Sequence, residues 1–167
     1  MRILGVDPGS RFTGLGLIDR VDGRLKYVCS ETIATAKERD LGEKLFRIHR
    51  GLGSFLADNR PHAVAVEKIF HSVNPRSSLI LGHARGVVLL TARLAGPEIR
   101  EFAPNEVKRA VVGVGRASKE QVAEMVRVLL NLDRRRKLPE DESDALALAI
   151  CFANTMDFRL LSQRAME

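Results

Sequence analysis

Four acidic side chains of this 167-residue chain occupy positions from which they could act together. Asp7 ends a short apolar run and opens into a Pro-Gly turn, and Glu67 ends a second apolar run. Sites in open α/β sheets form outside the carboxyl ends of the strands, so both carboxylates are expected at one sheet edge. Asp141 and Asp144 are three residues apart, so they share one face of a helix. The sequence therefore predicts that the four carboxylates converge.

Such a cluster has a defined chemistry. Carboxylates packed closely repel one another and shift each other's pKa values, so the arrangement requires cations. Ligand sets made only of oxygen favour hard ions, Mg²⁺ first, with Mn²⁺ as a substitute. Two such ions about 4 Å apart can activate water and stabilise the leaving oxygen during phosphodiester hydrolysis. We therefore expect a catalytic site that binds two Mg²⁺ ions.

Each carboxylate also has a purely structural explanation. Asp7 could simply start a turn. Acidic residues in the first turn of a helix are favoured by the helix dipole without any function. Asp144 fits that explanation less well, because it borders the apolar run 145–152 and should face inward. The repetition of a carboxylate at the end of a buried-type strand also argues against two unrelated surface turns.

The elements that must position these residues alternate between strand and helix. Strands are predicted at residues 3–6, 14–18, 24–33, 62–68 and 98–102, and the Asp22-Gly23 turn makes the first three an antiparallel meander. Helices are predicted at residues 40–59, 75–95, 104–112, 118–130 and from Pro139 onward. The sequence thus predicts one α/β domain over residues 1–156. For residues 157–167 we expect a short C-terminal tail, frayed or disordered.

The helix predicted at residues 75–95 is long and apolar, and it contains Gly82, Ala84 and Gly86. These small residues would allow another helix to approach closely. A core helix explains this pattern, and a helix shared between the core and a subunit interface explains it equally well.

The composition indicates a basic soluble protein. Lys and Arg number 27 against 21 Asp and Glu, which leaves a formal charge of +6 and favours a polyanionic partner, nucleic acid first. The two cysteines lie far apart without metal-ligand spacing, which suits a reducing cytoplasm. The N-terminus does not resemble a signal peptide, and no apolar run approaches the roughly 20 residues that span a bilayer. We expect a cytoplasmic protein without a membrane partner.

Several blocks of sequence, in order along residues 1–155, resemble the RuvC family of bacterial crossover-junction endodeoxyribonucleases. They are Ile3-Leu-Gly-Val-Asp-Pro-Gly-Ser10 with Thr13-Gly-Leu-Gly16, Ala65-Val-Glu67, Leu81-Gly-His-Ala-Arg-Gly86, Ala103-Pro104 with Val107-Lys108, Gly113-Val-Gly-Arg-Ala-Ser-Lys119 with Gln121-Val122, and Asp141-Glu-Ser-Asp144-Ala-Leu-Ala147. Any one block is a weak signal, and together they are specific.

The resemblance implies a ribonuclease-H-like fold, with a five-stranded mixed sheet flanked by helices. It implies a homodimer whose two sites nick opposite strands of a Holliday junction, which is a four-way DNA junction. The paired cuts are symmetric and leave 5′-phosphate and 3′-hydroxyl ends, in recombination and DNA repair. It also implies a partner complex, a branch-migration motor of the RuvA–RuvB type.

The resemblance also implies roles for individual residues. The catalytic and metal-binding carboxylates of the family map onto the same four residues that the residue types select. Phe70 matches the aromatic side chain that stacks on a base near the cleaved site. Lys108 and Lys119 match basic residues near the scissile strand, where they would hold phosphate or offset charge in the transition state. Arg76 is expected to bind DNA with them.

Two segments depart from the family pattern. Glu142 lies between the paired aspartates, where the family usually carries a small residue. It is interpreted either as a spectator that points to solvent or as a substitute ligand. The run Arg134–Lys137 is more basic than usual. By default it is a solvated loop, and beside DNA it would alter contacts to the junction arms.

Two other classes of protein fit part of the sequence. Asp-Pro-Gly-Ser followed by Thr-Gly also resembles the first phosphate loop of actin-like and sugar-kinase ATPases, which share this sheet topology. Those proteins need two such domains and far more chain than 167 residues. A non-catalytic DNA-binding module would use the basic surface alone, and convergent carboxylates would then oppose DNA binding. A metal-dependent nuclease accounts for both features.

Overall fold

The structure is a computed structural model that describes residues 1–68 and 75–164, with only the backbone described for 75–76 and 157–164. Within these ranges the chain forms five strands and five helices. The strands are β1 (Arg2–Asp7), β2 (Phe12–Val21), β3 (Arg24–Ala34), β4 (Ala63–Glu67) and β5 (Glu98–Phe102). The helices are α1 (Leu41–Asn59), α2 (Pro75–Ala95), α3 (Pro104–Val112), α4 (Lys119–Leu129) and α5 (Glu140–Arg164).

The strands form one mixed sheet in the order β3-β2-β1-β4-β5. The β1–β2 and β2–β3 pairs are antiparallel, and β1, β4 and β5 run parallel. Val6 of β1 lies beside Val66 of β4, so Asp7 and Glu67 leave the sheet at the same edge. The predicted five-stranded mixed sheet, and the prediction that both carboxylates lie at one edge, are therefore confirmed.

The β2–β3 hairpin is longer than the sequence pattern indicates, since β2 begins at Phe12 and ends at Val21 rather than at residues 14 and 18. Asp22 and Gly23 at its turn both have positive φ, 51° and 74°. Two positive φ values give the turn a twist that matches the strands on either side, so pairing continues up to the turn itself. β3 is consequently a long strand at the edge of the sheet.

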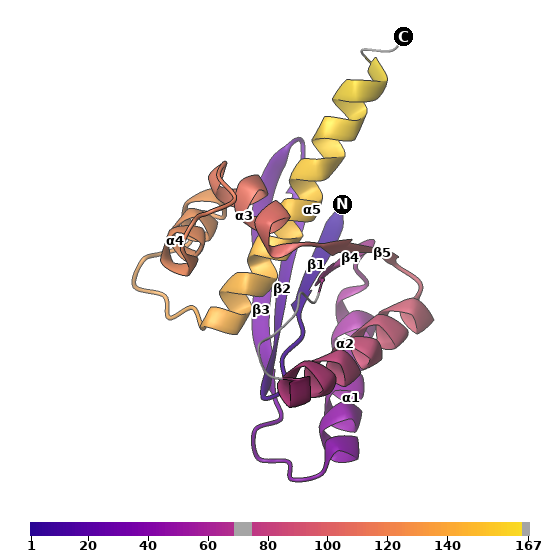
Figure 1. Cartoon of the computed structure of the whole chain (residues 1–167). Helices are drawn as coiled ribbons and strands as arrows, with labels where there is room; N and C mark the ends of the chain where they lie inside the picture. Colours follow the sequence, from indigo (N-terminus) through magenta and orange to yellow (C-terminus); the bar gives the residue numbers. More distant parts are fainter. Residues whose placement is uncertain (69–74, 165–167) are drawn as a thin grey trace.

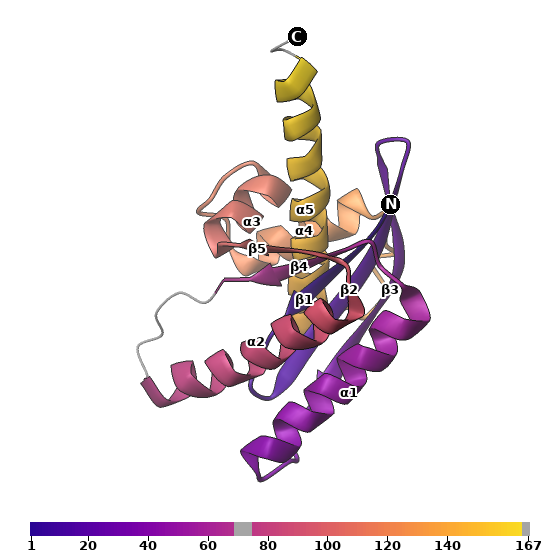
Figure 2. The same cartoon turned by 90° about the vertical axis from the view of Figure 1, so that its right-hand side faces the viewer.

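Helices cover both faces of the sheet (Figures 1 and 2). α5 crosses one face, with α3 and α4 beside it, and this core includes Leu146, Ile150 and Phe152. α1 and α2 cover the other face, where the core includes Ile48 and Leu52. The sheet is thereby fixed from both sides.

Side-chain caps fix the starts of α1 and α4, at the beginnings of the predicted ranges 40–59 and 118–130. Asp40 accepts a hydrogen bond from the Glu43 N–H at 3.0 Å. Ser118 and Gln121 form the reciprocal capping box of α4, with bonds of 3.3 Å and 2.8 Å. α5 begins at Glu140, directly after Pro139, and its backbone runs to Arg164 into the segment 157–167. The domain boundary at residue 156 stays a prediction.

Three strand glycines let the backbone of α5 lie directly on the sheet. A Cβ atom added at Gly5 would lie 1.8 Å from the nearest backbone atom of α5, and the corresponding distances are 1.9 Å at Gly14 and 2.6 Å at Gly16. Gly5 and Gly16 are paired partners on β1 and β2. Any side chain at these positions would push the helix away from the sheet.

This close approach determines where the first turn of α5 lies. Gly14 is the pairing partner of Asp7 across the β1–β2 ladder. The atom of α5 nearest to a Cβ at Gly14 is the carbonyl oxygen of Asp141. The glycine therefore brings the start of α5 over the strand position next to Asp7.

We expect Gly5→Ala to destabilise the fold, because the new methyl group would meet the Ala145 carbonyl oxygen. Overpacking of this kind costs on the order of 1–3 kcal/mol of unfolding free energy, measurable by urea denaturation. Gly53→Ala on α1 is the matched control, since its nearest neighbour is 4.0 Å away and alanine favours helix. A Gly5→Ala protein as stable as the wild type would contradict direct contact between α5 and the sheet.

Candidate active site

Three of the four predicted carboxylates line one cavity of about 190 Å³. Asp7 comes from the end of β1, Glu67 from the end of β4 and Asp144 from the second turn of α5. The remaining walls come from α3, α4 and α5, through Pro104, Val107, Lys108, Lys119, Val122, Ala147 and Leu148. The structure thus brings together carboxylates that lie up to 137 positions apart in the sequence (144 − 7).

Asp141 lies close to this cavity but does not line it. Its charge contributes to the raised pKa of Asp7. Among the described residues, no three Asp, Glu, His or Cys side chains are arranged tightly enough to hold a metal ion as they stand. The oxygens of these carboxylates would have to move closer together to bind one ion.

The pKa values of all four carboxyl groups are raised. The pKa of Asp7 is raised to about 7, first by burial and then by the charges of Glu67, Asp144 and Asp141 in that order. Burial is also the largest cause of the raised pKa of Glu67, Asp141 and Asp144. Negative charge is therefore held in this cavity at a free-energy cost, and a bound cation would lower that cost.

A lysine ammonium already lies beside one of these carboxylates. Lys119 Nζ is 3.4 Å from Asp144 Oδ2, and it also donates a hydrogen bond to Glu140. The Glu140 hydrogen bond is the main cause of the raised pKa of Lys119, with Asp144 adding to it. The ammonium marks a place where positive charge is favoured, and the surrounding donors are oxygens. The residues therefore fit a hard divalent cation.

Arg85 helps to position Glu67, a role that the sequence pattern does not indicate. Its Nε donates a hydrogen bond to the Glu67 carbonyl oxygen at 3.2 Å, and its guanidinium forms an ion pair with Glu101 of β5. These contacts connect α2 to the end of β4 and so fix the backbone of Glu67. Arg85 lies within the Leu81–Gly86 block, but no local spacing indicates its partners.

Thr13 is a second residue of this kind. It is fully buried, and its Oγ1 donates a hydrogen bond to the Gly9 carbonyl oxygen at 3.4 Å. This contact closes the Pro-Gly turn that follows Asp7.

The predicted DNA-binding residues have different outcomes. Lys108 and Lys119 both line the carboxylate cavity. Phe70 lies outside the described residues, and Arg76 is described only as backbone within α2. The cavity therefore has basic residues on its walls, while the roles of Phe70 and Arg76 stay predictions.

Glu142 is not a spectator that points to solvent, and its role as a substitute ligand stays a prediction. Glu142 does not line the carboxylate cavity, and it does not point freely to solvent. Its carboxylate accepts a hydrogen bond from Ser30 Oγ at 2.6 Å and a longer one from Thr32 Oγ1 at 3.4 Å. Both partners lie on β3, more than 100 residues away in the sequence, so no local pattern could indicate them.

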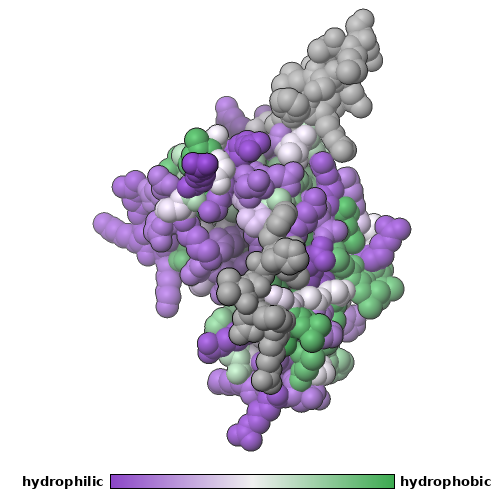
Figure 3. Space-filling view, viewed as in Figure 1, coloured by the Kyte–Doolittle hydropathy of each residue, from purple (hydrophilic) through white to green (hydrophobic). Residues whose placement is uncertain are grey.

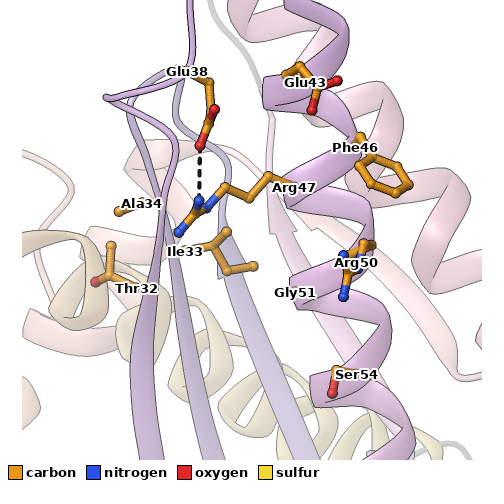
Figure 4. A pocket seen from close by; sticks show the side chains of 10 residues that line it. All are labelled: Thr32, Ile33, Ala34, Glu38, Glu43, Phe46, Arg47, Arg50, Gly51 and Ser54. Carbon is orange, nitrogen blue, oxygen red and sulfur yellow. Dashed lines mark hydrogen bonds and ion pairs between the residues drawn. The ribbon is translucent and has the colours of Figure 1, made fainter.

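A larger cavity of about 570 Å³ lies between β3 and α1 (Figure 4). Two of its charged residues, Glu38 and Arg47, form an ion pair at 2.9 Å that spans it. Its charges are thus largely balanced, whereas the smaller cavity concentrates carboxylates with raised pKa values. Titratable groups with shifted pKa values in a cleft indicate a functional site better than the volume of a cavity does. We therefore assign the candidate active site to the smaller cavity.

The sheet order and the carboxylates at the ends of β1 and β4 define an α/β domain of the ribonuclease-H-like class with an acidic site. Residues 3–152 match the family described as "Crossover junction endodeoxyribonuclease RuvC". The chain belongs to this RuvC family.

Individual relatives agree with this assignment. The chain is 51% identical to the RuvC protein of Syntrophotalea carbinolica, over 92% of this chain and 94% of that protein. The RuvC protein of Geotalea uraniireducens is 48% identical, over 93% of this chain and 90% of its own length.

Solved structures show the same fold. Thermus thermophilus RuvC matches with a TM-score of 0.84 and 34% identity, covering 95% of this chain and 96% of that chain. A second structure, of T. thermophilus RuvC in complex with Holliday junction substrate, also gives a TM-score of 0.84, with 31% identity and the same coverage of both chains. The yeast mitochondrial resolvase Ydc2 has a TM-score of 0.69 and 10% identity, covering 97% of this chain and 85% of its own, and shows the fold alone. The predicted ribonuclease-H-like fold is confirmed.

We expect Asp7→Asn to be more stable than the wild type at pH 8 in the presence of a chelator. A raised folded-state pKa of about 7, against 3.8 ordinarily, means that the folded protein loses stability as pH rises between these values. The amide cannot ionise, so the gain should be on the order of 1 kcal/mol or more at pH 8 and should shrink towards pH 4. Thermal unfolding at both pH values measures it, as a rise of about 2–4 °C per kcal/mol.

Added Mg²⁺ provides the control for this measurement. At pH 8 it should raise the melting temperature of the wild type more than that of Asp7→Asn. Identical melting temperatures for the two proteins at every pH would contradict the assignment of charge repulsion to this cavity.

Proposed function

We propose that this chain is a Mg²⁺-dependent endonuclease that resolves Holliday junctions in recombination and DNA repair. The observation that carries the proposal is that Asp7, Glu67 and Asp144 line one cavity with Lys108 and Lys119. This cavity combines a site for hard cations with basic groups for a phosphate. Family membership supports the junction as substrate, since T. thermophilus RuvC forms a complex with it.

The carboxylates would hold two Mg²⁺ ions, which supply an activated water and a stabilised leaving oxygen when bound. The backbones of Asp7 and Glu67 are fixed, because each residue lies at the end of a buried strand. Asp144 and Asp141 approach from the helix. Rigid strand ends hold the reacting groups in one geometry, which is what in-line displacement at phosphorus requires. The cleaved ends would be a 5′-phosphate and a 3′-hydroxyl.

The lysines would act on the phosphate rather than on the water. Once cations neutralise the carboxylates, Asp144 no longer needs the Lys119 ammonium, which can then contact the scissile phosphate. Lys108 faces the same cavity from α3. Both would offset charge that develops on phosphate oxygens in the transition state. Phe70 and Arg76 would contact DNA next to this site.

The exposed face of α2 supports a homodimer that makes paired, symmetric cuts. Leu79, Leu90 and Leu94 are 63%, 58% and 72% exposed, while Gly82 and Gly86 leave open space beside them. Hydrophobic side chains gather over this helix in Figure 3. The opposite face of α2 packs in the core through Ala84, Val88 and Ala92. Of the two explanations left open for this helix, we favour one shared between the core and a subunit interface.

The same helix, Ser77–Ala95, is the one described segment long and apolar enough to cross a membrane by length and composition. The expectation that no apolar run approaches the length of a membrane span is therefore wrong. Such a helix is weak evidence for a membrane span, since core helices of soluble proteins pass the same test. A dimer face explains its composition, and we propose a cytoplasmic protein that works on DNA. Residues 1–156 would form its single domain, and a branch-migration motor of the RuvA–RuvB type would be its partner.

Asp7→Asn and Glu67→Gln should abolish cleavage of a synthetic four-way junction. Loss of a group that organises transition-state stabilisation lowers the rate by about 100-fold or more. Gel-based cleavage with Mg²⁺ and junction binding with Ca²⁺ measure the two effects separately, and binding should be retained. Asp22→Asn in the exposed hairpin turn is the control, because asparagine tolerates its positive φ. Full activity in Asp7→Asn, or an uncut junction with wild-type protein and Mg²⁺, would disprove the proposal.

Leu90→Glu should convert the protein to a monomer, because it places a charge in the centre of the apolar face of α2. Analytical ultracentrifugation measures the mass. Val128→Glu on α4 is the matched control, since Val128 is similarly exposed, at 61%, and lies on another helix. An unchanged mass in Leu90→Glu, or a monomeric wild type, would count against the dimer face.

A further inference from the structure

A chain of polar contacts connects the basic loop before α5 to the first turn of α5. It runs from Arg136 to Tyr27 and Ser30 of β3, and from Ser30 to Glu142. We propose that Glu142 is a positioning residue, which fixes Asp141 for cation binding, and that Arg136 braces it through β3. The inference rests on the proposed metal-dependent function and assigns roles to two segments that depart from the family pattern.

The contacts of Glu142 hold α5 against the edge strand. Each oxygen of its carboxylate accepts from a different hydroxyl, Ser30 Oγ at 2.6 Å and Thr32 Oγ1 at 3.4 Å. Bonds to an ionised acceptor are stronger than those between neutral groups. All three residues are half-buried, which limits competition from water. This side chain therefore holds the helix against β3, while the strand glycines fix it over β1 and β2.

Arg136, in the loop before α5, also contacts β3. Its guanidinium carbon lies 4.4 Å from the centroid of the Tyr27 ring, and it donates a hydrogen bond to the Tyr27 hydroxyl. That hydroxyl is 3.0 Å from Ser30 Oγ. Arg136 therefore orients Tyr27, and Tyr27 orients the Ser30 hydroxyl that donates a hydrogen bond to Glu142.

Asp141 is the carboxylate that most needs such support. It is the second residue of α5, and the first turn of a helix lacks half of its backbone hydrogen bonds and frays readily. Asp144 lies a turn further in, beside the buried residues Ala145 and Leu146. The side chain next to Asp141 is the one bonded to β3. Fixing Glu142 consequently fixes the Asp141 backbone over Gly14.

Arg134 provides an internal comparison within the same loop. It forms an ion pair with Glu124 of α4 at 2.6 Å, with both side chains largely exposed. Exposed pairs of this kind contribute little to stability. Arg134→Ala and Arg136→Ala remove the same charge from the same loop, but only the second removes a contact with the Tyr27–Ser30–Glu142 chain. Comparing these two variants therefore separates a role in positioning Glu142 from a general attraction of the basic loop for DNA.

The experiment measures Mn²⁺ binding to the protein without DNA, from the electron paramagnetic resonance signal of free Mn²⁺. Glu142→Ala should weaken binding by about tenfold or more, the usual effect of losing an outer-shell partner. Glu142→Gln should restore most of the affinity, because its carbonyl still accepts from Ser30. Arg136→Ala should give a smaller loss and Arg134→Ala none. Junction cleavage by Glu142→Ala should then need a correspondingly higher Mg²⁺ concentration, with the rate at saturation less affected.

Circular dichroism verifies that each variant is folded, and Ser30→Ala replaces Glu142→Ala if that protein does not fold. Wild-type Mn²⁺ affinity in folded Glu142→Ala or Ser30→Ala would overturn the proposal. Equal losses in Arg134→Ala and Arg136→Ala would overturn the bracing role of Arg136. If no protein cuts the junction but the order of Mn²⁺ affinities holds, the proposed substrate fails while the positioning role stands.

Discussion

The contact between the α5 backbone and three strand glycines is the constraint on which the rest of the structure depends. Gly5, Gly14 and Gly16 leave no space between the sheet and the helix. The register places Gly14 opposite Asp7, so the helix start lies beside the strand end. A helix packed through larger side chains would lie further from the sheet, which would hold Asp141 and Asp144 away from Asp7. The three glycines thus allow the carboxylates of α5 to lie close to those at the strand ends.

That cluster opposes the stability of the fold that forms it. The pKa of Asp7 rises to about 7 because the carboxyl is buried among like charges. Lys119 offsets part of this repulsion from α4, and the core on both sheet faces supplies the remaining stability. Contacts further out, such as Arg85 on the Glu67 carbonyl and Ser30 on Glu142, fix the backbones from which the carboxylates project. A bound cation would then replace the repulsion between these carboxylates with metal–oxygen contacts.

Much of this arrangement could be predicted from the sequence, because its signals are local. Apolar runs ending in Asp7 and Glu67 predict strands, and the topology of α/β sheets places both residues at one edge. The predicted helix at residues 118–130 agrees with α4, whose N-cap is Ser118. The role of Gly14 could not be predicted, since it depends on which residue of a distant helix contacts it. The contacts of Glu142 could not be predicted for the same reason, because its partners lie on β3.

The central claim is that these carboxylates form one cation site when α5 lies on the sheet. The most direct measurement is the anomalous scattering of Mn²⁺ in crystals of the protein. We expect peaks in the cavity, within about 2.0–2.4 Å of oxygens of Asp7, Glu67 and Asp144, with Lys119 moved away from Asp144. Mn²⁺ peaks only elsewhere on the protein, with Lys119 still paired to Asp144 at saturating Mn²⁺, would contradict the claim.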